Sequence, residues 1–277
     1  MNLKTVLTIA GSDPCSAAGI QADLKTFSSL GTYGCTAITA ITVQNTRDIL
    51  DIFPLPNDIV INQIKFILKD IRIDSIKVGM VYDKKLIDKL FNILKTLNIP
   101  IIVDPILIST SRKNLIKSDA IKCFTKKILS IATITTPNAN EAKQLTGIEI
   151  NTKENLHKAL SKIMRLGPKN VIIKGGHIVS EQSTDTLIDD KFNIIEFSNP
   201  RLDIPENHGS GCNFSAALAA FIAQGYDISM ACKYANEFIN NALKNVLYIG
   251  KGYPVVDSAI ITSASSFKYQ VIEELSK

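Results

Sequence analysis

The stretch HGSGCNFSAALAA, residues 208–220, carries the residue types that point most directly to chemistry. Gly209 and Gly211 allow backbone N–H groups to turn towards a ligand, because no Cβ blocks the approach. Ser210 lies between them, and Cys212 follows in the first turn of a predicted helix, whose N-terminal end carries partial positive charge. This pattern predicts a site for an anion, a phosphate or an oxyanion. The alternative is an ordinary loop-to-helix junction with a buried cysteine.

Polar residues also follow five apolar segments of strand length. In open α/β sheets, ligands bind beyond the carboxyl ends of the strands. We therefore expect the five polar segments to share one cleft: Gly11-Ser12-Asp13, Gln44-Asn45, Asp104-Pro105, Pro137-Asn138 with Glu141, and Lys174-Gly175-Gly176-His177.

The elements that must position these residues alternate between strand and helix patterns. We predict strands at 3–10, 35–43, 75–80, 99–103, 131–135 and 170–174, helices at 20–30, 59–71 and 84–97, and helical structure from 211 to 247. Such alternation predicts an α/β fold with a mostly parallel central sheet. A hairpin formed by 186–189 and 193–197 predicts antiparallel strands at one edge. Since no internal repeat or linker occurs, we predict a single domain over residues 1–277.

Composition excludes several other classes of protein. Hydrophobic residues make up 45% of the chain and charged residues 21%, and the net charge of +5 is spread without a dense basic cluster. We therefore expect no nucleic-acid partner. The five cysteines are odd in number and form no CxxC motif, which argues against a disulfide framework or a structural zinc site. No apolar run is long enough for a signal peptide or a membrane span, so we expect a cytoplasmic protein.

Two nucleotide-binding motifs are absent from the chain. No G-x-x-x-x-G-K-[ST] sequence occurs, which excludes a P-loop. No G-x-G-x-x-G follows the first predicted strand, which argues against a nicotinamide-dependent dehydrogenase.

The segment GIQADLKTFSSLGTYG, residues 19–34, followed by Gln44-Asn45-Thr46, resembles the N-terminal signature of the hydroxymethylpyrimidine/phosphomethylpyrimidine kinases of thiamine biosynthesis. These kinases belong to the ribokinase-like superfamily. The resemblance extends over about residues 5–250, through VDP at 103–105, TPN at 136–138, KGGH at 174–177 and the cysteine-ended HGSGC. It implies a three-layer α/β/α sandwich and two successive transfers of the ATP γ-phosphoryl group, first to the hydroxymethyl group of the pyrimidine and then to the monophosphate.

The resemblance also implies ATP and Mg²⁺ as cofactors, a homodimer, and a role for each matching residue. Gln44 would bind the aminopyrimidine, with Gly11, Asp23 and Met80 lining the same pocket. The remaining matches are Gly209, Ser210, Gly211 and Cys212 in the anion hole, with Cys212 beside the reacting hydroxyl, Asp104 and Glu141 at Mg²⁺, and Lys174, Gly176 and Asn138 on the nucleotide side.

Elementary chemistry is consistent with these roles. Phosphoryl transfer depends on positioning and charge neutralisation, and Mg²⁺ prefers one or two carboxylates together with phosphate oxygens. The Gln44 amide can both donate to and accept from an aminopyrimidine edge. At a helix N-terminus we expect Cys212 to have a lowered pKa, so that its thiolate could accept the hydroxyl proton. The other interpretation is a passive thiol close to the developing charge.

Three departures from the family pattern concern loops. Residues 15–19 read Cys-Ser-Ala-Ala-Gly where the family usually has Ser-Gly-Gly-Ala-Gly, so two glycines are replaced. If either position needs a positive φ, the replacement costs roughly 1 kcal/mol or more. Arg112 replaces a usual glycine, and residues 203–207 differ from the usual approach to the anion hole. Two alternatives to the pyrimidine kinase therefore stay open: a pyridoxal/pyridoxine kinase, and a non-catalytic pyrimidine-binding protein.

Overall fold

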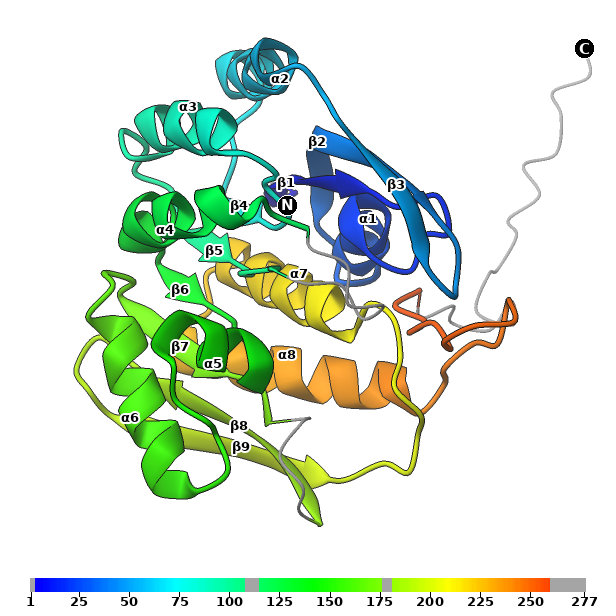
Figure 1. Cartoon of the computed structure of the whole chain (residues 1–277), viewed down its shortest axis with the longest axis vertical. Helices are drawn as coiled ribbons and strands as arrows, with labels where there is room; N and C mark the ends of the chain where they lie inside the picture. The colour runs from blue at the N-terminus through cyan, green and yellow to red at the C-terminus, as the bar shows by residue number, and fades with distance from the viewer. Residues whose placement is uncertain (1–2, 108–114, 176–180, 260–277) are drawn as a thin grey trace, which may run out of the picture.

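The fold was taken from a computed structural model, which describes residues 3–107, 115–175 and 181–259. Within these residues nine strands form one sheet in the order β3-β2-β1-β4-β5-β6-β7-β8-β9 (Figure 1). Pairing is parallel from β2 through β7. At the two edges, β3, β8 and β9 pair antiparallel. The strands are β1 (Thr5–Ser12), β2 (Tyr33–Gln44), β3 (Ile49–Pro54), β4 (Ser75–Val78), β5 (Ile101–Val103), β6 (Ile134–Thr135), β7 (Asn170–Ile173), β8 (Gln182–Ile188) and β9 (Ile194–Pro200).

Helices cover both faces of the sheet, which confirms the predicted three-layer architecture. One face carries α2 (Asn57–Asp70), α3 (Lys84–Leu94), α4 (Ser118–Lys127), α5 (Ala139–Thr146) and α6 (Lys153–Met164). The other face carries α1 (Gly19–Ser29), α7 (Ser210–Ala223) and α8 (Ile228–Leu243). A short 3-10 turn, η1 (Leu129–Ile131), precedes β6. Of the helices in the described residues, none is both long and apolar enough to cross a membrane.

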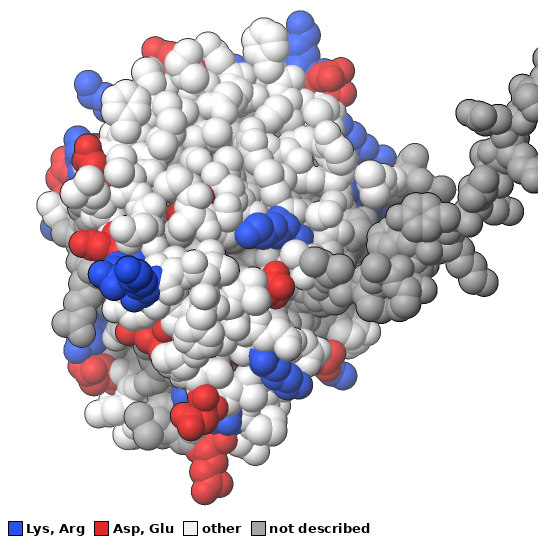
Figure 2. All heavy atoms as spheres, turned by 90° about the vertical axis from the view of Figure 1, so that its right-hand side faces the viewer, with Lys and Arg blue, Asp and Glu red and all other residues white. Residues whose placement is uncertain are grey.

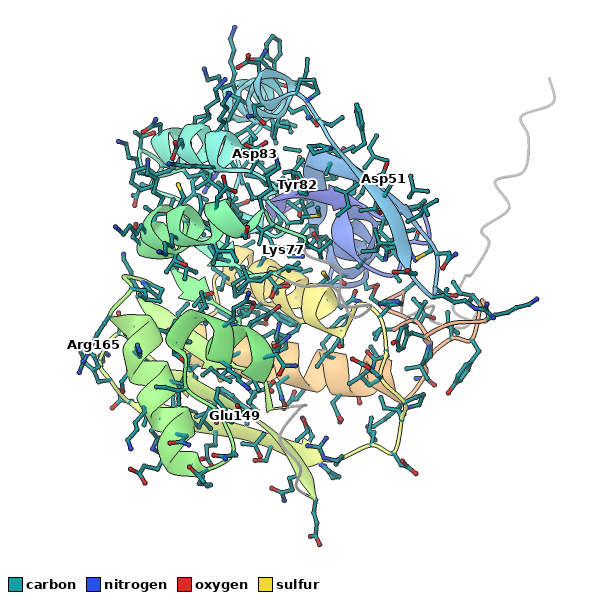
Figure 3. All side chains as sticks on the ribbon, in the orientation of Figure 1. Asp51, Lys77, Tyr82, Asp83, Glu149 and Arg165 are labelled. Atoms are coloured by element: carbon teal, nitrogen blue, oxygen red, sulfur yellow. The ribbon has the colours of Figure 1, made fainter. Side chains whose placement is uncertain are left out.

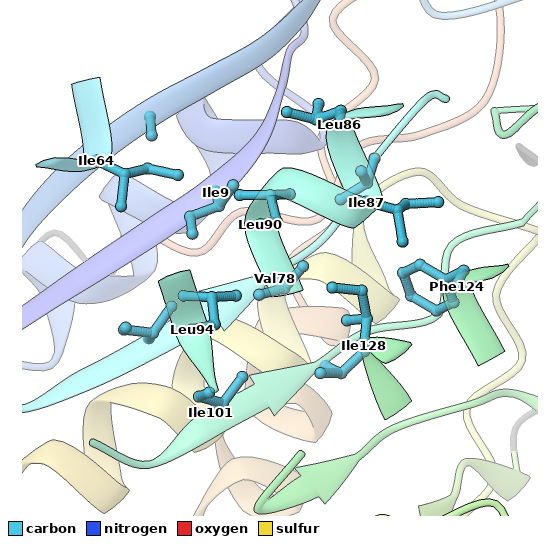
Figure 4. Packing of buried hydrophobic residues seen from close by; sticks show 14 of the residues in the cluster. Ile9, Ile64, Val78, Leu86, Ile87, Leu90, Leu94, Ile101, Phe124 and Ile128 are labelled. Atoms are coloured by element: carbon cyan, nitrogen blue, oxygen red, sulfur yellow. The ribbon is translucent and has the colours of Figure 1, made fainter. Parts of the chain in front are cut away.

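Both faces of the central strands are buried, so their side chains alternate between two apolar clusters. Leu7 of β1 and Ile101 of β5 pack with α2, α3 and α4, whereas Val6 and Ile102 pack with α7 and α8. Figure 4 shows the first of these clusters, in which Leu90 of α3 lies among strand residues. Burial on both faces explains why these strands appear as nearly continuous apolar runs in the sequence.

Most predicted elements occur within a few residues of their expected bounds. The helical stretch predicted from 211 to 247 divides into α7 and α8, because Gly225 adopts a left-handed conformation, with φ of 97°, just after α7. The short helices α4, α5 and α6 and the edge strand β3 had not been predicted. In β3 only Ile49 is buried, so the strand lacks an apolar run that would predict it.

Candidate active site

A cavity of about 1010 Å³ lies beyond the carboxyl ends of the parallel strands. Its size suits a small substrate together with a nucleotide. Eleven of the residues predicted for the site line it: Gly11, Gln44, Met80, Asp104, Asn138, Glu141, Lys174, Gly209, Ser210, Gly211 and Cys212. The predicted shared cleft is therefore present. Gly176, His177 and Arg112 lie outside the described residues.

The first turn of α7 presents free N–H groups to this cavity. Gly209 is the N-cap, with φ of 94°, and the first intrahelical bond runs from the Asn213 N–H to the Gly209 carbonyl at 2.9 Å. The N–H groups of Ser210, Gly211 and Cys212 therefore have no carbonyl acceptor within the helix. The Asn213 side chain fixes the turn, since its amide donates to the Gly209 carbonyl and accepts from Thr26 of α1. This geometry can bind an anion.

The loop between β1 and α1 packs against the first turn of α7. A Cβ on Gly209 would lie 1.9 Å from the Ala17 carbonyl oxygen, so only glycine fits there. The Asp13 carboxylate holds the loop by accepting from the N–H groups of Cys15, Ala17 and Ala18. Ser16, one of the two replaced glycines, has φ of 59°, whereas Ala17 has no positive φ. The replacement therefore strains one position of the two.

Cys212 does not have the lowered pKa that its place at a helix N-terminus suggested. Burial raises the pKa of the Cys212 thiol to about 11, although the Lys77 ammonium acts in the opposite direction. The carboxylates of Asp104 and Asp23 raise the pKa further, and the Gly19 N–H, which donates to the thiol, lowers it. Desolvation of a thiolate outweighs the helix dipole here. At neutral pH Cys212 is a thiol with access to a minor thiolate form.

Asp104, Glu141 and Lys174 form a charged cluster next to Gly211. The Lys174 ammonium lies 3.1 Å from Asp104 Oδ1 and would lie 3.1 Å from a Cβ on Gly211. Burial by itself lowers the pKa of Lys174, but the nearby Asp104 and Glu141 raise it above its ordinary value. Burial raises the pKa of Glu141 to about 7, against the opposing effect of Lys174. Lys174 thus faces the anion-binding turn as well as the predicted nucleotide side.

The same cluster was tested as a site for a magnesium ion. Thr136 and Lys174 donate to Asp104 Oδ1, and Ser215 donates to Oδ2 at 3.1 Å. Glu141 Oε2 accepts from the Asn138 N–H at 2.7 Å in the capping box of α5, and Oε1 accepts no hydrogen bond from the described residues. No group of three or more His, Cys, Asp or Glu side chains in the described residues could hold a metal. Two carboxylates suit Mg²⁺ only if phosphate oxygens complete its shell.

The other end of the cavity has the character of a pocket for a small polar ring. Gln44 ends β2, and its Oε1 accepts from the Thr42 hydroxyl at 3.2 Å, which orients its amide. Met80 is buried, and its Sδ would lie 3.1 Å from a Cβ on Gly11. A glycine at position 11 therefore leaves the room that a side chain would fill. Gln44, Met80 and Gly11 lie together as predicted.

Asp23 does not line this pocket, which corrects its predicted role. Its fully buried carboxylate on α1 pairs with the Lys77 ammonium of β4 and accepts from the Thr8 hydroxyl at 2.6 Å. Burial raises the pKa of Asp23, whereas the pKa of Lys77 is raised because Asp23, Cys212 and Asp104 outweigh the effect of its burial. We assign both side chains as charged, because neutralising either would leave the other charge buried and unpaired.

A series of hydrogen bonds organises the predicted nucleotide side of the cavity. Asp185 of β8 accepts from the Gly175 N–H at 2.9 Å and from the Asn236 amide of α8 at 2.9 Å. Asn236 in turn accepts from Asn199 of β9 at 2.5 Å. A Cβ on Gly175 would lie 1.8 Å from the Thr184 carbonyl oxygen, so the strand β8 packs directly on this glycine. Contacts that involve β8, β9 and α8 therefore hold the start of the glycine loop after β7.

The segment 245–256 joins the loop after Gln44 to the approach to Gly209. The Gly252 and Tyr253 N–H groups donate to the Thr46 hydroxyl and carbonyl oxygens, at 3.1 and 2.8 Å. Farther along, the His208 N–H donates to the Pro254 carbonyl at 2.9 Å, and the Val256 N–H donates to the His208 carbonyl at 3.2 Å. The loop after Gln44 and the approach to Gly209 are thus held by one stretch of chain.

Comparison with known proteins agrees with this geometry. Residues 13–257 match the phosphomethylpyrimidine kinase family. The chain is 39% identical over 256 residues to the hydroxymethylpyrimidine/phosphomethylpyrimidine kinase of Haemophilus influenzae, covering 91% of this chain and 95% of that protein.

The chain belongs to the phosphomethylpyrimidine kinase family.

The solved structures that resemble this family member include both phosphomethylpyrimidine kinases and pyridoxal kinases. The phosphomethylpyrimidine kinase of Clostridium difficile superposes with a TM-score of 0.77 at 37% identity, over 87% of this chain and 99% of that one. The pyridoxal kinase of Staphylococcus aureus in complex with AMP-PCP and pyridoxal superposes with a TM-score of 0.84 at 34% identity, over 95% and 96% of the two chains. The comparisons therefore show a small-molecule kinase, and they leave both the pyrimidine and pyridoxal as candidate substrates.

The roles of three residues of this phosphomethylpyrimidine kinase family member had not been predicted from the sequence. Lys77 is the only charged residue of the buried strand β4, and a lysine inside an apolar run was the available signal. Asp13 had been noted only as part of a polar turn, although its carboxylate organises the whole loop. Asp185 carries no signal in the sequence, because its partners come from distant elements.

Proposed function

We propose that this chain transfers the ATP γ-phosphoryl group to the hydroxymethyl group of 4-amino-5-hydroxymethyl-2-methylpyrimidine, and then transfers a second one to the resulting monophosphate. The observation that carries the proposal is that one cavity is lined both by Gln44 and Met80 and by the first turn of α7. The names of the sequence relatives, at 34 to 39% identity, support the same assignment. Solved relatives in complex with AMP-PCP or ADP support the use of ATP.

In this proposal each group has a defined task. The Gln44 amide binds the aminopyrimidine edge and places the hydroxymethyl group beside Cys212. The N–H groups of residues 210–212 and the Lys174 ammonium receive the negative charge of the transferring group. Asp104 and Glu141 would hold Mg²⁺ together with phosphate oxygens, and the ion would neutralise phosphate charge when bound. Cys212 either accepts the hydroxyl proton or contributes to the anion hole as a thiol.

The second candidate is phosphorylation of pyridoxal. It is favoured by the close superposition with the Staphylococcus aureus pyridoxal kinase that binds pyridoxal. Gln44 favours the aminopyrimidine, because its amide can exchange two hydrogen bonds with a ring nitrogen and an adjacent amino group. A non-catalytic pyrimidine-binding protein would keep the pocket but hydrolyse or transfer no phosphate.

The deciding experiment follows products by mass with Mg·ATP and each of the two substrates. The pyrimidine monophosphate, followed by the diphosphate, is expected, with a kcat/KM for the pyrimidine above that for pyridoxal. A higher kcat/KM for pyridoxal would overturn the pyrimidine assignment, and binding without any product would establish the binding protein. The Gln44→Ala variant should raise the KM for the pyrimidine roughly tenfold, since one or two hydrogen bonds are lost. Gln63→Ala, an amide on α2 that contacts β2 outside the cavity, is the matched control.

We also propose that residues 1–277 form a single cytoplasmic kinase domain that assembles as a homodimer. The outer face of β2 and β3 supports the dimer, because Ile41 and Phe53 are 46% and 61% exposed and lie opposite each other across the two strands. Figure 2 views this side of the molecule and shows a broad area with few charged side chains. Sedimentation equilibrium should give twice the chain mass, and Phe53→Glu should give the chain mass. A monomeric parent protein would contradict the proposal.

A further inference from the structure

Lys77 is a lysine in the centre of the sheet, where a charge is unusual. Its side chain, labelled in Figure 3, is 0% exposed and contacts Asp23 of α1 and the Cys212 carbonyl of α7, the helix that packs on β4. The neighbouring Ile76 and Val78 point to the opposite, apolar face. Buried lysines are rare unless they are paired, and a pair of apolar residues would stabilise such a position equally well. The position of this charge therefore calls for an explanation other than stability.

The contacts of Lys77 connect it to the first turn of α7. Its ammonium pairs with Asp23 and lies 3.4 Å from the carbonyl oxygen of Cys212. Thr8 is its neighbour across the β1–β4 register, and the Thr8 hydroxyl holds the other oxygen of Asp23. Residues of β1, β4 and α1 thus hold the ammonium next to the backbone of Cys212 in the anion-binding turn. Neither oxygen of Asp23 is left to bind a ligand.

A second ammonium lies on the other side of the same turn. Lys174 lies beside Gly211 and pairs with Asp104, and it lines the cavity. Lys77 also borders the cavity, although its side chain has no exposed surface. The charged groups around Cys212 are therefore Lys77, Lys174, Asp23 and Asp104. Among them, Lys77 is the one that most favours negative charge on the Cys212 sulfur.

We propose that Lys77 is a positioning residue of the transfer reaction, whose permanent positive charge, held by Asp23, stabilises negative charge at Cys212 and at the first turn of α7 without touching the substrate. This inference rests on the proposed kinase function. In the step concerned, the substrate hydroxyl oxygen forms a bond to the γ-phosphorus as the bond to the β,γ-bridging oxygen breaks and ADP leaves. The hydroxyl proton passes to the Cys212 sulfur, which accepts it in the thiolate form. Lys77 gives up neither a proton nor electrons.

The test uses two variants with opposite expected effects on the Cys212 thiol. Asp23→Asn removes the carboxylate beside the ammonium, while Asp104 and Cys212 still favour the charged form of Lys77, so alkylation of Cys212 by iodoacetamide at pH 8 should become faster. The double variant Asp23→Asn/Lys77→Met removes both charges and leaves no unpaired ion, so alkylation should become slower, by roughly tenfold. The readout is the mass of the peptide that contains Cys212. If Lys77 had only a structural role, the two variants would not change the alkylation rate in opposite directions.

Turnover gives the second readout. In the double variant kcat should fall by roughly 10- to 100-fold while the KM for the pyrimidine changes less than about twofold, because the lost charge acts on the transition state. Ser75→Ala is the matched control, since the Ser75 hydroxyl on the same face of β4 bonds to Ala219 of α7 at 2.8 Å and carries no charge. The control should keep its kcat. A double variant with the parent's kcat and alkylation rate would overturn the proposal.

The two readouts also separate this inference from the proposed function. Alkylation needs no substrate, so the expected opposition of sign would stand even if the parent protein phosphorylated neither pyrimidine nor pyridoxal. That result would refute the kinase assignment and leave the effect of Lys77 on Cys212 in place. Conversely, normal turnover of the parent with equal alkylation rates in both variants would refute the role of Lys77 alone.

Discussion

The strained loop between β1 and α1 allows a prediction about stability in which position 17 is the control for position 16. Ser16 and Ala17 both stand where the family usually has glycine, but only Ser16 has a positive φ, at 59°. A non-glycine residue in the left-handed region costs about 1 to 2 kcal/mol. Glycine gains about 0.4 to 1 kcal/mol of freedom in the unfolded chain, which opposes folding. The net effect of Ser16→Gly should be an increase of roughly 0.5 to 1 kcal/mol in the free energy of unfolding.

Ala17→Gly should act in the opposite direction. Ala17 is 1% exposed, so its methyl group is lost from a packed environment, and glycine also gains freedom in the unfolded chain. The two effects together should lower the free energy of unfolding by roughly 1 to 2 kcal/mol. Reversible urea unfolding of the metal-free protein measures both variants. Destabilisation by Ser16→Gly, or stabilisation by Ala17→Gly, would refute the assignment of strain to position 16.

Three further predictions concern the site itself. Gly209→Ala should reduce turnover more than about 100-fold, because the methyl group would meet the Ala17 carbonyl and displace the anion-binding turn; Gly225→Ala, with a similar φ of 97° and no atom within 4 Å of the added Cβ, should keep its turnover. Glu141→Gln keeps the capping box but removes a carboxyl group whose folded pKa, about 7, lies above its unfolded value. That carboxyl group stabilises the fold fully below about pH 4.5 and loses this contribution as the pH rises through 7. The metal-free variant should therefore gain stability relative to the parent between pH 5 and 7.5, by up to roughly 3 kcal/mol, and an unchanged difference in urea unfolding would contradict the shift. Cys212→Ala should lower kcat without raising the KM for the pyrimidine; if the thiolate is the base, the parent's kcat should also rise up to about tenfold per pH unit from 7 to 9, and a flat profile would assign Cys212 the passive role.

The parts of the fold that could be predicted are those with long apolar patterns. Strands β1 and β7 are buried on both faces, so their sequences already resemble sheet cores. The edge strand β3 exposes most of its side chains, and α5 has only eight residues, so neither carries a comparable signal. For these elements tertiary contacts decide the structure, and a single sequence holds little information about them.

The candidate site was predictable where glycines and polar residues follow strands. Gln44, Asp104, Glu141 and Gly209 meet in one cavity because parallel strands end at the same edge. The electrostatics were not predictable in the same way. The pKa of Cys212 depends on burial, and the role of Asp23 depends on a lysine 54 residues away in the chain. Desolvation and long-range pairing are properties of the folded protein and leave no local pattern.

The contact between Thr46 and Gly252 spans 206 residues of the chain. Because synthesis on the ribosome proceeds from the N-terminus, the loop that follows Gln44 exists long before the segment that fastens it. The sheet strands β1 to β7 can be made and paired before that segment is translated. The loop after Gln44 and the approach to Gly209 are therefore fastened to each other only after translation has passed residue 256. A premature stop before residue 252 would therefore yield a protein that has the sheet but in which the loop after Gln44 lacks its contact with Gly252.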